Sequence, residues 1–306
     1  MAKRTNDLGR DSVGKLLVRL AVPTVTAQLV NALYNIVDRI YIGHIEEVGD
    51  LALTGLGVCF PVILFVSALS ALVGMGGASR AVVRMGEGSE ERANAILGSC
   101  TTLLTVLGLA ATVVFLAVQE PMLYLFGATE ETIGYAMDYM TIYLLGSIFV
   151  ELSLGLNYFI TAQGFSTMGM MTVLIGAVIN IVLDPVFIFA FDMGVRGAAL
   201  ATITAQAVSA VWVVWFLVGK RTKLRILRRF LRPRWSILAP VLALGLSPFI
   251  MQATESLVNI SFNASLKAYG GNPAVGAMTI CSSVMQVFSL LFQGLSQGAQ
   301  PIIGFN

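Results

Sequence analysis

Charged residues are scarce in this chain. Aspartate, glutamate, lysine and arginine make up 12% of its 306 residues, and hydrophobic residues make up 57%. A soluble domain has about 25% charged and about 45–50% apolar residues. The composition therefore excludes an ordinary soluble domain and predicts an all-α polytopic membrane protein.

Signatures of three other classes of protein are missing as well. Cys59, Cys100 and Cys281 all lie in apolar runs, without the spacing of a disulfide framework or a metal site. The run 9–15 resembles a phosphate-binding loop, but Leu16 stands where a hydroxyl should hold magnesium. The Gly-x-Gly-Asp run of intramembrane aspartyl hydrolases does not occur. We expect no enzyme, no cofactor and no transport driven by ATP.

Apolar runs long enough to span a bilayer recur along the chain. A transmembrane helix needs about 20 residues. With the N-terminus in the cytoplasm, only Arg39, Arg196 and Lys267 of the 19 lysines and arginines lie on the outer side. The positive-inside rule therefore predicts a multi-pass protein of the inner (plasma) membrane with a cytoplasmic N-terminus. The runs cover roughly residues 16–43, 51–79, 94–118, 132–160, 169–191, 197–219, 236–268 and 274–303.

A basic connector divides the chain. Within residues 220–235, Leu224, Leu227 and Leu231 fall along one side of a helix, with arginines elsewhere. This pattern is typical of an amphipathic helix at the inner membrane surface. We expect the connector to separate a six-helix lobe, residues 1–219, from an incomplete second lobe, residues 236–306.

An internal repeat supports this division. Pro23 in the first predicted helix has a counterpart at Pro248 in the seventh, and each is followed by a run with a polar stripe. A complete repeat would give about 440 residues and twelve helices. We therefore expect the chain to be a truncated fragment that does not transport by itself.

The first apolar run carries that polar stripe. Gln28, Asn31, Asn35 and Asp38 follow one another at intervals of three, four and three residues, which places them on one narrow face of a helix. An ionised side chain inside a bilayer costs about 2.5–3.5 kcal/mol on insertion scales, and it usually faces a bundle interior, a cavity or a transport path. Asp38 is therefore a candidate for cation binding.

The fifth and sixth predicted helices carry matching polar faces. Asn180 and Asp184 are one turn apart, and Thr202 lies near the start of the sixth helix. The predicted topology puts these residues and Asp38 in the outer halves of their helices, so all four can form one cluster. Its oxygen atoms suit Na⁺, or a proton shared between two carboxyls. A network of hydrogen bonds without a transported ion is the alternative. The two faces consist of Thr172, Gly176, Asn180 and Asp184, and of Thr202, Gln206 and Ser209.

Three motifs resemble a known family. They are Asn31-x-x-x-Asn35-x-x-Asp38, Asn180-Ile-Val-Leu-Asp184-Pro185 and Gln297-Gly-Ala-Gln-Pro301. In combination they resemble the multidrug and toxic compound extrusion (MATE) family, in particular its bacterial MepA-type branch. The resemblance implies two pseudo-symmetric six-helix lobes around a central cavity. This chain would hold one complete lobe and the first two helices of the second.

The resemblance also implies site residues. A cation site, with Na⁺ as one candidate ion, would lie at Asp38, Asn180, Asp184 and Thr202, with Asn157 and Tyr139 as neighbours. Glu255 resembles an acidic position of the second lobe, and a structural hydrogen bond is its alternative. For Met285, packing is the alternative to substrate contact. For Glu151, two roles are open: pairing with another helix, or a second protonation site. The substrate cavity would be lined by Asn35, Gln206, Glu255, Asn259, Gln286 and Met285.

The leading prediction is a secondary antiporter. It would export organic, often cationic, drugs in exchange for Na⁺ or H⁺ by alternating access. A flippase or exporter of a lipid or metabolite on the same fold is the first alternative. An intramembrane aspartyl hydrolase that uses Asp38 and Asp184 is the second. We expect a monomer in the lipid bilayer that binds small organic cations or drugs and no nucleic acid.

Overall fold

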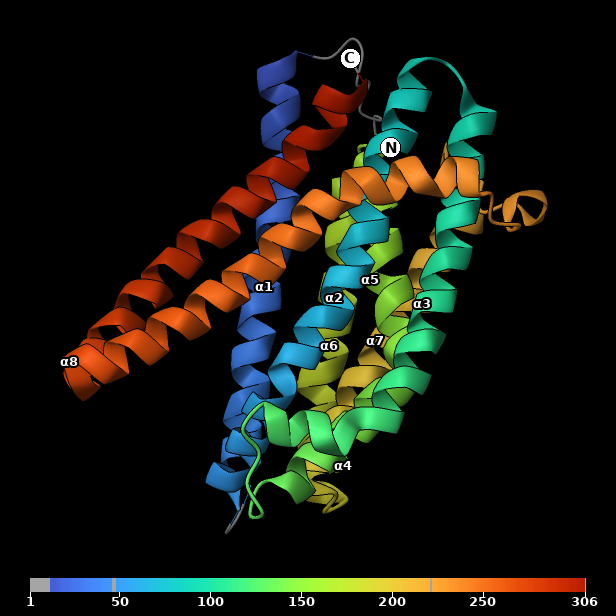
Figure 1. Ribbon diagram of the computed structural model, residues 1–306. Helices are drawn as coiled ribbons and strands as arrows, with labels where there is room; N and C mark the ends of the chain where they lie inside the picture. Colours follow the sequence, from blue (N-terminus) through green and yellow to red (C-terminus); the bar gives the residue numbers. More distant parts are fainter. Residues whose placement is uncertain (1–11, 46–47, 221, 306) are drawn as a thin grey trace.

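A computed structural model describes residues 12–45, 48–220 and 222–305, without the side chains of residues 252–253, 255–284 and 286–287. Every regular element in these residues is a helix (Figure 1), which confirms the all-α prediction. The elements are α1 (Val13–Gly43), α2 (Gly49–Gly86), α3 (Glu90–Leu125), α4 (Ile133–Leu145), α5 (Ser147–Ala162), α6 (Ser166–Pro185), the π-helical turn η1 (Val186–Ala190), α7 (Gly194–Val218), the 3₁₀ turn η2 (Arg228–Phe230) and α8 (Trp235–Phe305).

The described helices are those of a multi-pass membrane protein. Five spans are long and apolar enough to cross a membrane: α1, α2, α3, α6 continued by η1, and α7. The bent pair of α4 and α5 makes a sixth when it is counted as one span. These six begin close to the first six predicted apolar runs, since uninterrupted hydropathy over about 20 residues is a strong signal.

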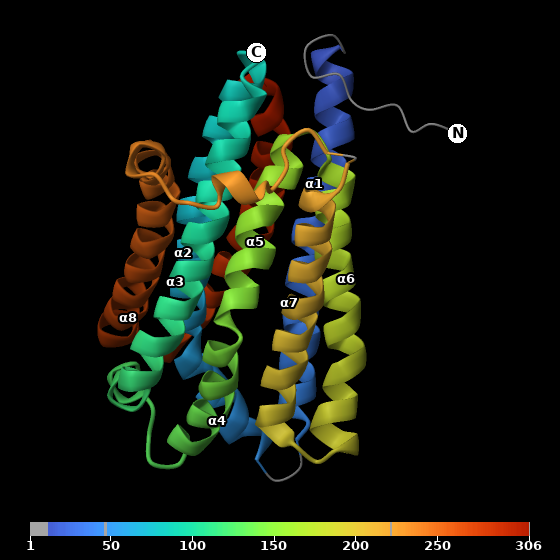
Figure 2. The same cartoon turned by 90° about the vertical axis from the view of Figure 1, so that its right-hand side faces the viewer.

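Helices α1 to α7 form a bundle. Helix α1 packs against α6, α6 against α7, and α7 against α5 (Figure 2), while α2 packs against α3 and α5. Small residues permit close contact between helices: a Cβ atom added at Gly74 of α2 would lie 2.7 Å from the Gly155 carbonyl oxygen of α5. Buried apolar side chains gather in two main clusters, one toward α4 and one toward the opposite end of the bundle.

The fourth predicted span is broken. Helices α4 and α5 meet at Gly146 with a bend of 57°, whereas the sequence predicts one straight run over residues 132–160. A side chain at Gly146 would overlap Ile203 of α7. The glycine therefore allows α7 to approach the chain at the bend.

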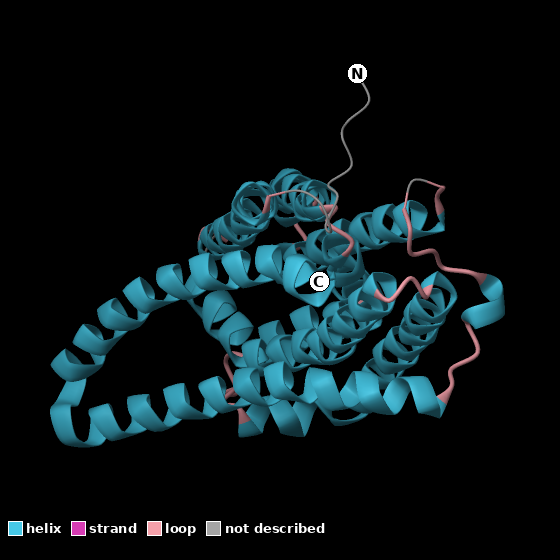
Figure 3. Cartoon of the chain, turned by 90° about the horizontal axis from the view of Figure 1, so that it is seen from above, coloured by secondary structure: helices cyan, strands magenta, loops and turns pink. Residues whose placement is uncertain are grey.

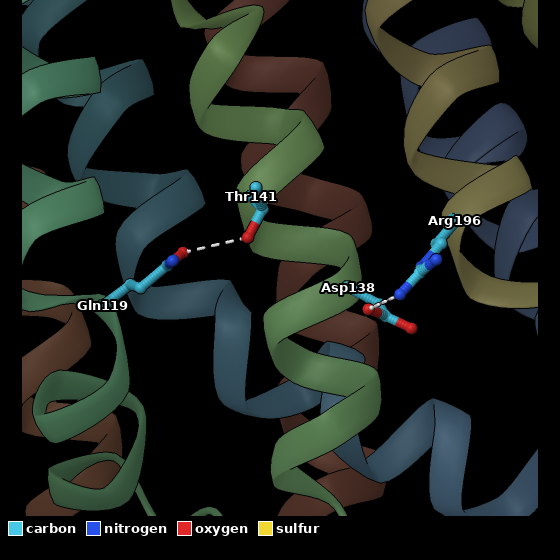
Figure 4. Close-up of polar contacts among 4 residues, drawn as sticks. All are labelled: Gln119, Asp138, Thr141 and Arg196. Carbon is cyan, nitrogen blue, oxygen red and sulfur yellow. Dashed lines mark hydrogen bonds and ion pairs between the residues drawn. The ribbon is translucent and has the colours of Figure 1, made fainter.

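Polar contacts on two sides hold α4 in place (Figure 4). The Thr141 hydroxyl of α4 donates to the Gln119 side-chain oxygen of α3 at 3.2 Å. On the other side, Arg196 of α7 donates to the Asp138 carboxylate at 2.8 Å. These contacts fix the rotation of α4 about its own axis, and with it the direction of the tyrosines on its buried face.

Helix α8 differs from the two separate spans predicted for residues 236–268 and 274–303. The structure has one continuous helix, Trp235–Phe305, that doubles back on itself (Figures 1 and 3). Gly270, Gly271 and Pro273 lie between the predicted spans, and such residues bend a helix without ending it. The first arm packs against α2, and the arm that ends at Phe305 packs against both α1 and α2. In the second arm, the Gly294 carbonyl accepts from Thr24 of α1 at 2.6 Å, and Gln300 donates to Ser79 of α2 at 2.6 Å.

The prediction of an amphipathic helix over residues 220–235 is wrong. Between Thr222 and Arg234, only the 3₁₀ turn η2 is helical. Backbone N–H groups that a helix would use donate instead to side chains of the bundle: Leu224 N to Gln163 at 2.8 Å and Arg225 N to Asn94 at 2.7 Å. These tertiary hydrogen bonds compete with the helical ladder and hold the connector in an extended form.

Candidate cation site and polar cavity

Two buried carboxyl groups meet between α1 and α6. Asp38 lies near the end of α1 and is 8% exposed, and Asp184 lies at the end of α6 and is fully buried. The two carboxyls lie within electrostatic range of each other. None of the described ion pairs includes either residue, and Arg39, next to Asp38, is exposed and lies over the Phe60 ring. Two acidic groups thus share a site without a cationic partner among these pairs.

An amide and a hydroxyl complete the group. The Asn180 amide nitrogen donates to Asp184 Oδ1 at 3.1 Å and makes a 3.4 Å contact with Thr202 Oγ1 of α7. The buried Tyr139 of α4 lies within electrostatic range of Asp38 and next to Thr202. The structure therefore places all four residues of the predicted cluster together, with Tyr139 beside them. We call these five residues the carboxyl cluster.

Three oxygen atoms of the carboxyl cluster are left without a partner. Asp38 Oδ1, Asn180 Oδ1 and Asp184 Oδ2 are buried and accept no hydrogen bond from the described residues. Buried polar atoms are nearly always hydrogen-bonded, so each exception needs an explanation. Carboxylate and amide oxygens are hard ligands that suit a cation such as Na⁺, and two adjacent carboxyls can equally share a proton.

The end of α6 is shaped by Pro185. Proline has no N–H group, so the hydrogen bond to the Ile181 carbonyl is missing. The chain then widens into the π-helical turn η1, which Phe191 N closes by donating to the Val186 carbonyl at 2.9 Å. Such turns are frequent at functional sites. Here the turn begins two residues after Asp184.

A polar cavity adjoins the carboxyl cluster. Its volume is about 40 Å³, enough for a few water molecules at about 10–15 Å³ of such volume each. Residues of both predicted polar faces line it, so the faces of α6 and α7 meet at the cavity. The lining residues are Asn31, Tyr34, Ser153, Leu154, Asn157, Thr172, Val173, Gly176, Ala177, Asn180, Thr202, Ala205, Gln206 and Ser209.

The residues predicted for substrate contact are scattered. Gln206 lines the polar cavity and accepts a hydrogen bond from Ser153. Asn35 is exposed, donates to the Asn31 carbonyl at 2.7 Å and does not line this cavity. Met285 of α8 is 64% exposed. The side chains of three further candidates, Glu255, Asn259 and Gln286, lie outside the described residues.

Asn157, predicted as a neighbour of the cation site, lies across the polar cavity on α5. Its amide nitrogen donates to the Gly169 carbonyl of α6 at 3.3 Å. Its side-chain oxygen is buried and has no partner among the described residues. Asn157 therefore presents a free acceptor near the cavity, although no contact joins it directly to the two aspartates.

Two tyrosines of the site are absent from the predicted list. Tyr34 of α1 lines the polar cavity and lies within electrostatic range of Asp38 and Asp184. Tyr143 of α4 stacks on Tyr139, with ring centroids 6.2 Å apart. The signal was a spacing of one helical turn, since each tyrosine lies four residues from a predicted site residue.

Comparison with known proteins gives the family. The MatE family model matches residues 23–186, which is more than half of the chain. The chain belongs to the MatE family.

Curated relatives and solved structures agree with this assignment. The multidrug export protein MepA of Staphylococcus saprophyticus is 26% identical over 297 residues, which cover 97% of this chain and 65% of that protein. A multidrug resistance MATE family transporter of the MOP superfamily, solved in an outward-facing conformation, superposes with a TM-score of 0.90 at 26% identity, over 99% of this chain and 67% of that one. A MOP superfamily transporter from Pyrococcus furiosus gives the same values. The MATE-like fold is thereby confirmed, and the chain spans about two thirds of these proteins.

Proposed function

We propose that the protein is a secondary active transporter that exports organic, often cationic, drugs in exchange for Na⁺ or H⁺. The observation that carries this proposal is the set of three buried oxygen atoms without partners in the carboxyl cluster. A purely structural network would satisfy these atoms within the protein. A coupling ion that comes and goes leaves them free in one of its two states.

The position of the carboxyl cluster suits coupling. It joins α1, α4, α6 and α7 through Asp38, Tyr139, Asp184 and Thr202, so a bound cation draws four elements together. Release of the cation leaves two acidic groups facing each other, which repel when both are ionised. The ion therefore favours one packing of α1 against α6, and drug binding favours the other. Such differential affinity is all that exchange requires.

The names of the relatives support a drug as the transported molecule. The Staphylococcus saprophyticus relative is named a multidrug export protein, and one structural neighbour is described as a multidrug resistance transporter. We propose the same class of cargo for this protein, which would lie in the inner (plasma) membrane with its N-terminus in the cytoplasm. The excess of lysine and arginine in the connectors on the N-terminal side supports this orientation.

The test is drug efflux from proteoliposomes of the full-length protein under an imposed Na⁺ or H⁺ gradient. We expect Asp184→Asn to lower gradient-driven efflux by about 5- to 150-fold, the range of typical coupling energies. The substitution keeps the shape of the side chain and removes its ability to bind a cation by charge.

The matched control is Asp192→Asn. Asp192 lies eight residues further on and is exposed, with a positive φ of 53°, a backbone conformation that asparagine tolerates as well as aspartate. Efflux by this variant should equal that of the wild type. Unchanged efflux by Asp184→Asn would place the coupling ion elsewhere and overturn the proposal.

A second candidate keeps the fold and changes the cargo to a lipid or metabolite. The described lining of the polar cavity contains amides and hydroxyls but no charged side chain, so it does not by itself favour a cation. The Pyrococcus furiosus transporter is described as having a binding pocket of reverse polarity that suggests a different function. Efflux of a neutral or anionic cargo, with no efflux of organic cations, would favour this candidate.

A further inference from the structure

Glu151 is a buried carboxyl group that the proposed exchange leaves unused. It lies on α5, is fully buried, and neither of its oxygens accepts a well-formed hydrogen bond from the described residues. Its chain neighbours Val150 and Leu152 pack into the two main apolar clusters. An ionised carboxylate in such surroundings costs several kcal/mol unless a cation pairs with it, and none of the described ion pairs includes Glu151. Burial therefore favours the protonated form of this side chain.

The proton of Glu151 is shielded by the contact between α2 and α5. The hydroxyl of the fully buried Ser70 of α2 is within reach of the carboxyl; its other contact is a long one, 3.4 Å to the Val66 carbonyl. One turn further along the two helices, Gly74 and Gly155 bring the backbones into contact. Water can reach Glu151 from this side only when α2 and α5 separate.

Tyrosines link Glu151 to the carboxyl cluster. Tyr143 of α4 is buried and lies within electrostatic range of both Glu151 and Tyr34. Tyr34 lies in turn within electrostatic range of Asp38 and Asp184. Charges in a buried, poorly screened region interact over longer distances than charges in water. A change in the charge of one site therefore changes the free energy of protonation at the other.

Titratable groups on the other helices around α5 have contacts of their own. Arg196 of α7 pairs with Asp138, and Asp184 of α6 accepts from Asn180. Cys100 of α3 lies against Gly77 of α2. Helix α8 also packs against α5, and its described side chains include no titratable group. Among the described groups, Ser70 of α2 and Tyr143 of α4 lie within range of Glu151.

We propose that Glu151 is a second proton-binding site, separate from the carboxyl cluster and coupled to it electrostatically through Tyr143 and Tyr34. The carboxyl gives its proton to water when the contact between α2 and α5 opens, and takes a proton from water before the contact closes. The proposal builds on the proposed cation exchange at the carboxyl cluster, and it adds a binding site for a proton outside that cluster.

Infrared difference spectroscopy tests the site directly, because protonated carboxyl groups have a distinct C=O stretching band. Spectra of the full-length protein in lipid are recorded as the pH is raised. We expect a component of this band that the wild type loses with rising pH and that Glu151→Gln lacks at every pH. The matched control is Glu120→Gln, which neutralises an exposed acid on α3 and should retain the component.

Two further variants test the surroundings of the site. Ser70→Ala should shift the frequency of the component, because the nearest donor is removed. Asp184→Asn should shift the pH at which the component is lost, since the charge of the carboxyl cluster has changed. Glu151→Asp keeps an acid at the position. If this variant retains the infrared component at a shifted frequency, its loss in Glu151→Gln is not caused by misfolding.

Spectra of Glu151→Gln that match the wild type at every pH would overturn the proposal. So would a Glu151 component that stays constant as the pH changes, because a purely structural acid keeps its proton. The measurement needs neither drug nor ion gradient. Failure of gradient-driven efflux would therefore count against the proposed exchange and leave the result on Glu151 unaffected.

Discussion

The two ends of the bundle, which Figure 2 shows, differ in how their buried acceptor atoms are hydrogen-bonded. At the connector end, the Gln163 side-chain oxygen accepts hydrogen bonds from the Thr222 hydroxyl and from Leu224 N, while Asn94 accepts one from Arg225 N. At the end where α1 and α6 finish, the carboxyl cluster keeps three buried oxygens without described partners. The Gln163 and Asn94 acceptors are satisfied from within the protein, whereas the three oxygens of the carboxyl cluster are not. At the connector end the buried Ser166 hydroxyl, which has no partner among the described residues, is an exception.

This difference in hydrogen bonding distinguishes a structural network from a ligand-binding site. A fully satisfied network of hydrogen bonds rigidifies a fold, whereas unsatisfied buried atoms are tolerated where a ligand completes them. Substitutions at the connector end should therefore lower stability and spare ion coupling. Substitutions in the carboxyl cluster should do the reverse.

The largest effect on stability is expected between the two ends, at Gly74→Ala. The new methyl group would lie 2.7 Å from the Gly155 carbonyl oxygen and 2.6 Å from the Tyr158 ring, so α2 and α5 must separate. Overpacking of this kind costs about 1–3 kcal/mol, and the backbone contact places this case near the upper value. Thermal unfolding in detergent measures the change.

Gly57→Ala on the same helix is the control for Gly74→Ala. Among the described residues, no atom lies within 4 Å of the position that its methyl group would occupy. Alanine should be neutral there or stabilise the helix by up to about 1 kcal/mol. Equal unfolding temperatures for the two variants would contradict the close contact of α2 and α5.

Gln163→Met breaks the satisfied network at the connector end. Methionine keeps the length of the side chain and leaves the buried Leu224 N–H without an acceptor, which costs about 1–3 kcal/mol. We expect a lower unfolding temperature with the drug-to-ion ratio of transport unchanged. The matched control, Gln119→Met, removes one contact with Thr141 at the partly buried side of α4. A changed transport ratio in Gln163→Met would contradict the division into a structural end and a functional end.

The smallest effect is expected at the ion pair of α4 and α7. Asp138 and Arg196 are 37% and 62% exposed, so Asp138→Asn should cost less than about 1 kcal/mol, and less still at high salt. A double-mutant cycle with Arg196→Gln isolates the pair. A coupling energy well above this value would show that the pair controls the angle between α4 and α5.

Sequence patterns predicted much of this architecture because the signals are local. Long apolar runs gave the first six spans. A spacing of one turn put Asn180 and Asp184 on one face, and the predicted topology placed Thr202 at the same depth. The same spacing pointed to Tyr34, four residues before Asp38, but tyrosine in an apolar helix is more often a packing residue. Its role depends on the position of α6, which no local pattern contains.

The features that the sequence did not predict depend on distant partners. The connector is extended because Gln163 and Asn94, far away in the chain, accept its backbone hydrogen bonds. The bend at Gly146 depends on the approach of Ile203 from α7. Hydrophobic periodicity describes one helix at a time, so it predicts which face is polar and not which helix that face meets.

The most direct test measures transport of the drug and of the ion in the same experiment. Proteoliposomes of the full-length protein are loaded with a fluorescent organic cation, and efflux of the cation is recorded with the flux of Na⁺ and of protons. We predict a fixed ratio of transported drug to transported ion for the wild type, and no ion flux linked to drug efflux for Asp184→Asn. A ratio that stays the same in Asp184→Asn would contradict the claim that the unsatisfied oxygens of the carboxyl cluster bind the coupling ion.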